Sequence, residues 1–394
     1  MKSSLEIARP AALAACLLCF GAAAFAAQPE TRAFRNQLAV GSQQIRLANL
    51  AGRIELTPGA GDQLVIETTV HAAGKNAAET QALLSGMKWV KGRDAKGREE
   101  WALSYPVDDY RGFYYPDSRS GEEPSFFGGL FEGGTSSLYR GEKVRVYGNP
   151  RAGVPTLYAD VRIAVPESAK LFVRNVVGAV GGGALRGDVS IDTGCGDVKV
   201  ASFEGHLSID TGSGDIKVGT ARGESSFDTG SGDVRIANLI GNGAVDTGSG
   251  GVRIDNVSAG KLSIDTGSGD VYVGSGSAGK LLADTGSGGI QVMGVEIDEL
   301  VADTGSGDVT LQSPLGKAHR VSIETGSGDV EIRGGQQASF DVSSDIGSGR
   351  LIVGYTDATL RKDGRKVVGA RRLDGRTAIH VETGSGDCTI SPQL

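Results

Sequence analysis

The chain has 394 residues, of which 62 are glycine, and its formal net charge at pH 7 is −7. A mildly acidic chain lacks the electrostatic footprint of a nucleic-acid-binding protein, so we expect no nucleic-acid partner. Glycine at this level would suggest low complexity, but apolar and polar residues alternate regularly around the glycines, which indicates an ordered chain.

The N-terminus, residues 1–26, has the pattern of a signal peptide. Lys2 and Arg9 precede an apolar run, and Ala24-Phe25-Ala26 fits a small-x-small cleavage site. We therefore expect an exported protein of the periplasm or cell surface. No later stretch reaches 18 apolar residues, so we expect no membrane span after cleavage.

Four cysteines are present, and two of them, Cys16 and Cys19, lie in the predicted signal peptide. Leu13-Ala14-Ala15-Cys16 also resembles a lipoprotein box, although the apolar run before Cys16 is short for one. Cys195 and Cys388 would remain after cleavage. We expect them to lie too far apart for a disulfide bond.

Residues 27–170 are predicted to form an N-terminal cap of strands and one helix. Apolar residues alternate with polar ones over residues 45–68, which predicts an opening group of strands. A short helix is expected from Asn76, with Glu79 three residues on as in a capping box. A glycine-rich loop over residues 105–155 carries many aromatic residues, which either fold over the end of the repeats or form a binding surface for a glycan or protein.

The following part of the chain contains ten copies of one short phrase, mostly DTGSGD. The copies begin at Asp192, Asp210, Asp228, Asp246, Asp265, Asp284, Asp303, Glu324, Asp345 and Glu382. Subtracting successive starting numbers gives steps of 18, 18, 18, 19, 19, 19, 21, 21 and 37 residues. A fixed period of this kind is typical of a solenoid.

Each repeat reads as a strand, a tight turn and a second strand, as in LSIDTGSGDIKV from Leu207 to Val218. The period of two predicts an inward row and an outward row of side chains. The inward row is Leu207, Ile209, Thr211, Ile216 and Val218, and the outward row is Ser208, Asp210, Asp215 and Lys217. Gly212 and Gly214 are expected to supply positive φ angles and a close backbone approach at the turn.

The predicted fold is therefore all-β: a single-stack β-solenoid of about ten coils of 18–21 residues over residues 171–394. Residues 170–180 are expected to form a degenerate first coil, with Asn175 in the place of the first Asp. A basic hairpin over residues 356–380 fills the 37-residue step and is expected to close the last coil. Its rival interpretation is a basic tip that touches an anionic envelope polymer.

Three features together resemble the DUF4097 family, a bacterial group of β-strand repeat proteins. They are the predicted export signal at the N-terminus, the strand segment from Ile163 to Pro166, and the repeated DTGSGD coils. The resemblance covers roughly residues 40–394. It implies a β-solenoid associated with the cell envelope, for which adhesion is inferred, and it offers no catalytic residues to transfer. The aromatic loop departs from the plainer members of the family.

Two kinds of chemistry compete with a purely structural interpretation of the repeated acids. Asp-Thr-Gly-Ser is also the active-site phrase of aspartic proteases, but those enzymes need two copies on facing lobes. Ten stacked acids would repel one another, and bound calcium would relieve the repulsion, as in a β-roll. In the structural alternative, the carboxylates accept hydrogen bonds from turn N–H groups and meet Lys199, Lys217, Arg235 and Arg253.

We expect a non-enzymatic protein of the bacterial envelope that acts as an adhesin or a scaffold, with no catalytic residues, no cofactor and no metal site. Its expected partner is an envelope protein or a glycan. The alternatives are a calcium-binding β-roll-like protein and a polysaccharide-active β-helix enzyme. For the enzyme, Trp101 and the aromatic loop would be the place to look.

Overall fold

The structure, a computed structural model, describes residues 28–116 and 134–393. The predicted signal peptide with Cys16 and Cys19 lies outside the described residues, as do Phe126, Phe127 and Phe131 of the aromatic loop. The described residues form strands and a single helix, so the predicted all-β class is confirmed. The described residues contain no helix with the length and apolar composition that crossing a membrane requires.

The N-terminal part is built from ten strands around an antiparallel group. They are β1 (Glu30–Ala39), β2 (Ile45–Ala51), β3 (Ile54–Gly59), β4 (Gln63–Ala73), β5 (Trp89–Arg93), β6 (Glu99–Leu103), β7 (Gly112–Tyr114), β8 (Thr135–Tyr139), β9 (Glu142–Tyr147) and β10 (Thr156–Pro166). Strand β4 pairs antiparallel with β1 and β10, while β3 pairs in parallel with β10. The strands predicted over residues 45–68 are thus present as β2, β3 and the start of β4.

The predicted helix is α1 (Ala77–Gly86), which begins as its sequence indicates. The Asn76 side chain accepts a hydrogen bond from the Glu79 N–H at 2.9 Å. The Glu79 carboxylate accepts from the Lys75 N–H at 2.6 Å instead of from the N-cap residue itself. The helix packs on β4 and β1 at the end of the sheet.

The aromatic residues that the structure describes mostly enter the N-terminal core. Tyr105, Phe113 and Tyr139 are buried, and the Tyr105 ring lies 5.6 Å from each of the other two ring centroids. The hydroxyl of Tyr139 donates to the Leu103 carbonyl at 2.8 Å, so this polar atom is satisfied inside the core. These contacts favour a covering role for the described part of the loop.

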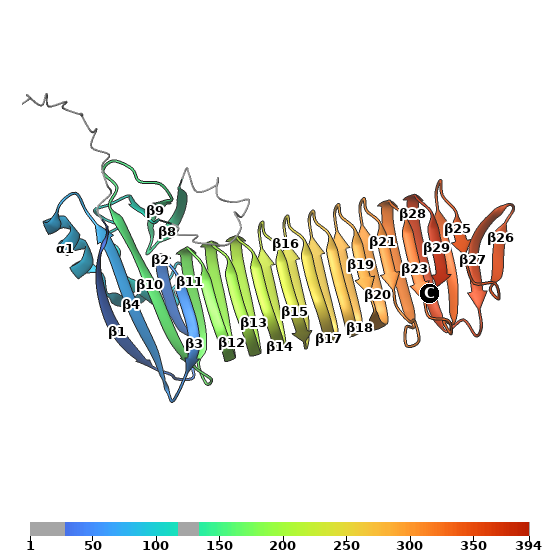
Figure 1. Cartoon of the computed structure of the whole chain (residues 1–394), viewed down its shortest axis with the longest axis horizontal. Helices are drawn as coiled ribbons and strands as arrows, with labels where there is room; N and C mark the ends of the chain where they lie inside the picture. Colours follow the sequence, from blue (N-terminus) through green and yellow to red (C-terminus); the bar gives the residue numbers. More distant parts are fainter. Residues whose placement is uncertain (1–27, 117–133, 394) are drawn as a thin grey trace, which may run out of the picture.

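The repeats form a long stack of parallel strands that runs from the N-terminal part to the far end of the molecule (Figure 1). Its strands are β11 (Lys170–Val177), β12 (Val180–Cys195), β13 (Val198–Ser213), β14 (Ile216–Thr229), β15 (Val234–Ile240), β16 (Gly243–Thr247), β17 (Val252–Thr266), β18 (Val271–Thr285), β19 (Ile290–Met293), β20 (Val295–Thr304), β21 (Val309–Gln312), β22 (Arg320–Ser327) and β23 (Val330–Gly334). Equivalent residues of neighbouring repeats are register partners, as Asp210 is with Asp228. The stack continues into the N-terminal part, because β11 pairs with β2 and β12 pairs with β3.

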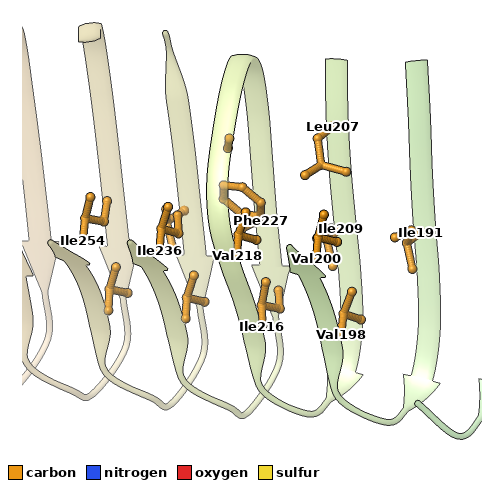
Figure 2. Packing of buried hydrophobic residues seen from close by; sticks show 14 of the residues in the cluster. Ile191, Val198, Val200, Leu207, Ile209, Ile216, Val218, Phe227, Ile236 and Ile254 are labelled. Carbon is orange, nitrogen blue, oxygen red and sulfur yellow. The ribbon is translucent and has the colours of Figure 1, made fainter. Parts of the chain in front are cut away.

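The apolar residues of successive repeats fill the interior of the stack (Figure 2). Leu207, Ile209, Ile216 and Val218 are buried, as predicted from the alternation. Thr211 is also buried and faces the same interior. Each repeat contributes only a few such side chains, so the apolar area that one repeat buries by itself is small. The burial becomes stabilising when neighbouring repeats cover both flat ends of that repeat.

The C-terminal end departs from simple sequential stacking. Its strands are β24 (Phe340–Ile346), β25 (Leu351–Val353), β26 (Thr359–Asp363), β27 (Lys366–Arg372), β28 (Thr377–Ser385) and β29 (Cys388–Pro392). Strand β28 pairs in parallel with both β22 and β24, and β29 pairs with both β23 and β25. The last repeat in the sequence therefore lies between the eighth and the ninth, so Glu382 neighbours both Glu324 and Asp345.

The basic segment forms the hairpin β26–β27, whose second strand pairs antiparallel with β24. The hairpin thus covers one edge of the ninth repeat, not of the last one as expected. The hairpin lies there because β28 and β29 already occupy the position between the eighth and the ninth repeats.

Two further details correct the sequence-based expectations. Asn175 is the register partner of Thr193, and Arg174 stands opposite Asp192, so Asn175 takes the Thr position and not the Asp position. Gly212 and Gly214 do not have positive φ angles; Gly205 and Gly223 outside the phrase do, and within the first copy of the phrase Gly196 does. The expectation of close approach is correct, because a Cβ on Gly214 would lie 2.3 Å from the Gly196 carbonyl oxygen.

Candidate functional site

The repeated turn contains three columns of polar side chains, each formed by equivalent residues of successive repeats. One is the column of buried threonines, one the column of first acids, and one the column of second Asp residues. Each column has a different environment, so the same six-residue phrase supplies three different kinds of interaction.

The buried threonines connect neighbouring turns. The Thr247 hydroxyl donates to the Gly232 carbonyl of the preceding repeat at 3.2 Å, and Thr304 donates to Gly288 at 2.9 Å. Burial of a hydroxyl is costly without a hydrogen bond, and here the partner lies in the neighbouring repeat. The threonine therefore acts as a structural link and is not presented to solvent.

The first repeat breaks this pattern because asparagines occupy the threonine positions before it. Asn49 and Asn175 are buried register partners, and the Asn49 amide donates to the Asn175 side-chain oxygen at 3.1 Å. The Asn175 amide also donates to the Gly178 carbonyl at 2.8 Å, the position that the hydroxyl of Thr193 would otherwise reach. The Thr193 hydroxyl has no hydrogen-bond partner. Sequence reasoning missed this pair, since Asn49 lies outside any repeated phrase.

The second Asp of each phrase also joins neighbouring repeats. The Asp215 carboxylate accepts from the backbone N–H of Asp233 at 3.1 Å, and the Asp233 carboxylate accepts from that of Gly251 at 2.9 Å. Lys217 and Arg235 lie 3.3 and 2.6 Å from Asp215 and Asp233, respectively. Pairing with backbone N–H groups and with Lys or Arg was expected for the first acid of each phrase; the structure shows it for the second Asp instead.

The first acids of the phrases form the acidic column, in which Asp192 is half-buried and the other acids are exposed. In spatial order the column consists of Asp192, Asp210, Asp228, Asp246, Asp265, Asp284, Asp303, Glu324, Glu382 and Asp345.

Several carboxyls of the acidic column are harder to ionise than usual. Burial, followed by the charge of a neighbouring acid, raises the pKa of Asp210 and of Asp228. Burial also raises the pKa of Asp192, against which the nearby Arg174 and Arg46 guanidinium groups act. Like charges about 4.8 Å apart in one row account for the neighbour effect.

Metal binding by this column has no support in the contacts. Among residues 28–116 and 134–393, no group of three or more His, Cys, Asp or Glu side chains is placed to hold a metal ion. Asp210 and Asp228 lie in neighbouring parallel strands of one stack. In an aspartic protease, by contrast, the two aspartates come from two facing lobes.

The two cysteines of the described residues are both free, as expected. Cys388 is fully buried in β29, and burial raises the pKa of its thiol to about 12, which leaves it protonated and unreactive. Cys195 stands at the first turn, where the Ser213 hydroxyl donates to its sulfur at 3.4 Å.

The remaining predicted locations have structural partners in the described residues. Trp101 lies in β6 and is the register partner of Leu47 in β2. In the basic hairpin, Arg361 pairs with Asp341 at 2.5 Å, and Arg372 pairs with Asp357 at 2.7 Å. Much of the positive charge of the hairpin is thus used against neighbouring acids.

Two of the solved structures that match this chain do so at low identity and low TM-score. A Clostridium sporogenes ATCC 15579 structure described as a "putative cell adhesion protein" has 8% identity and a TM-score of 0.17, over 93% of this chain and 100% of that chain. A Bacteroides fragilis NCTC 9343 structure described as a "putative adhesin" has 13% identity and a TM-score of 0.26, over 93% and 99%. TM-scores this low support no conclusion about function.

Comparison by sequence is more informative for the second half of the chain. No curated protein matches. The family model described as Toastrack DUF4097 matches residues 228–391, a range that begins at one motif copy and contains all the later ones. Over residues 228–391 the chain is therefore similar to the Toastrack DUF4097 family.

Proposed function

We propose that this protein is an exported, non-enzymatic β-solenoid of the bacterial envelope, with about ten coils of 18–21 residues, that serves as an adhesin or an envelope scaffold. The observation that carries the proposal is the use of the repeated polar residues. Thr247 and Asp233 bind backbone groups of the neighbouring repeat, so the phrase maintains a long regular surface.

A regular stack suits display better than catalysis. Catalytic sites bring a few unlike groups together in a pocket, whereas the first acids recur evenly along one side. The family resemblance supports the envelope setting, and the N-terminal signal supports export.

Two experiments test the two halves of this proposal. Cell fractionation of the full chain and of a variant without residues 1–26 should find the full chain outside the cytoplasm and the truncated chain inside it. The purified chain from residue 27 onward should bind bacterial cells or isolated peptidoglycan, and it should leave soluble polysaccharides uncut. Retention of the full chain in the cytoplasm would contradict export, and polysaccharide cleavage would contradict the non-enzymatic role.

A further inference from the structure

A row of four basic side chains follows the outer face of the strands after the turn. Lys199, Lys217, Arg235 and Arg253 are successive register partners in β13, β14, β15 and β17. The spacing of paired strands places neighbouring members about 4.8 Å apart. Four like charges in adjacent positions are unfavourable unless a counter-charge compensates them.

The basic row lines a shallow groove of about 530 Å³ that extends over four repeats. The lining of the groove includes three small residues, Ala201, Gly219 and Ala237, which we call the floor residues. A Cβ on Gly219 would lie 2.3 Å from the Ala201 carbonyl oxygen, so the backbones approach closely along the floor. The groove therefore runs along the stack, past the same position of each repeat.

The charge of the groove lining is strongly one-sided. Four of the residues that line it are basic and one, Asp255, is acidic and pairs with Arg253 at 2.8 Å; the other acids that pair with the row, Asp215 and Asp233, lie at the turn, outside the lining. The chain as a whole has a net charge of −7, so the basic groove is a local feature and not part of a generally basic protein. Local positive charge of this kind attracts an anionic ligand.

Two members of the basic row, Lys217 and Arg235, combine ion pairs with side chains that remain partly in solvent. The side chains of Lys217 and Arg235 are 41% and 48% exposed, and ion pairs at this exposure contribute little to stability. Asp215 and Asp233, their partners, each also accept a backbone N–H, which keeps these carboxylates at the turn. The cations can therefore reorient toward the groove while the acids stay in place.

A polar ladder adjoins the lining of the groove, on the same strands but outside the lining itself. Thr220, Asn238 and Asn256 come directly after Gly219, Ala237 and Asp255 in the sequence. The Asn238 amide donates to the Thr220 hydroxyl at 3.3 Å, and the Asn256 amide donates to the Asn238 oxygen at 3.3 Å. Side-chain amides and hydroxyls in a row are suitable partners for the hydroxyl groups of a sugar chain.

The basic row ends at an aromatic residue. Tyr272 is the register partner of Arg253, and the Arg253 guanidinium lies 4.1 Å from the Tyr272 ring centroid. A single ring offers one stacking position, whereas proteins that bind single-stranded nucleic acid stack successive bases on several aromatic side chains. This favours a carbohydrate over a nucleic acid as the anionic ligand.

We propose that the groove binds a linear anionic polysaccharide with carboxylate groups on its sugar residues, aligned with the long axis of the stack. The carboxylates pair with Lys199, Lys217, Arg235 and Arg253, and the polar ladder contacts the hydroxyls. This inference deepens the proposed adhesin or scaffold role and rests on it, because it names the class of envelope polymer that the protein recognises.

The test uses the chain from residue 27 onward and a defined probe, oligogalacturonate, with dextran as the neutral polymer. The variant Lys217→Gln/Arg235→Gln removes two charges from the groove. Its matched control, Lys261→Gln/Arg320→Gln, removes two exposed charges from another face of the stack. Isothermal titration at low and high salt measures binding, and thermal melting monitored by circular dichroism verifies that each variant folds.

The groove variant should bind oligogalacturonate at least tenfold more weakly than wild type, while the control variant should match wild type. High salt should weaken the wild-type interaction, because the contacts are between exposed charges. Equal affinity in the groove variant would overturn the proposal. Equal binding of dextran, or tighter binding of a single-stranded oligonucleotide, would overturn the assigned ligand class.

A second readout separates this inference from the proposed function. Binding to isolated envelope material is measured for the wild type and for both double variants. Wild-type binding that the groove variant retains in full would contradict the groove but leave the adhesin or scaffold role intact. Binding of oligogalacturonate without any binding to envelope material would support the groove and contradict that role.

Discussion

The closest contacts between neighbouring repeats are backbone contacts at glycine, and Gly232→Ala tests them. A Cβ at this position would lie 2.1 Å from the Gly214 carbonyl oxygen and 2.6 Å from its carbon. Both are backbone atoms of the preceding turn, so no side chain can rotate away. Relief of the clash requires the two turns to separate.

The required separation follows from the geometry. A Cβ contact shorter than 3.0 Å is essentially never observed, so a contact at 2.1 Å must lengthen by 0.9 Å. The same two turns are joined by the Asp233 N–H to Asp215 and by the Thr229 hydroxyl to Gly214, both at 3.1 Å. Adding 0.9 Å would take each to 4.0 Å, beyond hydrogen-bond distance. With about 1–3 kcal/mol for overpacking and about 0.5–1.5 kcal/mol for each of the two lost bonds, we expect about 2–6 kcal/mol of destabilisation.

The assay compares Gly232→Ala with Ser231→Ala, a substitution in the same turn that introduces no backbone clash. Urea unfolding measures the overall loss of stability. Because stacked repeats interact mainly with their neighbours, hydrogen exchange should additionally show faster exchange over residues 212–250 and unchanged exchange in β4. The close-approach reasoning would be refuted if the free energies of unfolding of Gly232→Ala and Ser231→Ala agreed within about 0.5 kcal/mol and both variants showed the same protection from hydrogen exchange.

Three further outcomes are expected. Burial and then the Asp210 charge raise the pKa of Asp228, so this carboxyl reduces stability as the pH rises from its unfolded pKa of about 3.9 through its folded pKa. The Asp228→Asn variant should therefore have a higher melting temperature than wild type at pH 7 and the same melting temperature as wild type near pH 3. If variant and wild type had equal melting temperatures at both pH values, the repulsion would be contradicted. Thr247→Val removes the hydrogen bond to the Gly232 carbonyl and should lower the free energy of unfolding, measured in urea, by about 1–3 kcal/mol. The outward substitution Thr310→Val should lower it little. Similar losses in the two variants would contradict the role of the buried threonine as a link between repeats. Deletion of residues 377–394 removes β28 and β29 from between two other repeats, so limited proteolysis should cleave residues 340–372 in the truncated chain and spare them in the full chain; resistance of the truncated chain would contradict the inserted order.

The repeat pattern made much of the stack predictable. The period of two around the glycines identified Leu207 and Ile209 as inward residues, and both are buried. The helix cap at Asn76 was also predictable, because its hydrogen bond is local in sequence. Interactions of this kind depend on spacing alone.

The order of the last three repeats could not be predicted from the same pattern. The phrases at Glu324 and Glu382 are identical in sequence, so no local signal shows which repeat stands beside which. The long step before Glu382 is the only sequence feature that permits the terminal strands to return inward. The hairpin β26–β27 occupies that step and pairs with β24.

The chemistry of the turn was predictable only in part. A turn acid was expected to accept a backbone N–H, and the second Asp of the phrase does so, whereas the first remains in the exposed column. The polar ladder could have been found from the 18-residue spacing of Asn238 and Asn256. The Asn49–Asn175 pair joins residues far apart in sequence, so only the fold brings them together.

Distances between spin labels on the acidic column test the stack most directly. Labels at Asp210 and at Asp303, Glu382 or Asp345, measured by pulsed electron paramagnetic resonance, report five, seven and eight steps along the stack. At about 4.8 Å per step, the backbone separations should be about 24, 34 and 38 Å. The account predicts that Asp345 is farther from Asp210 than Glu382 is; the reverse order, or distances that do not grow with the number of steps, would contradict it.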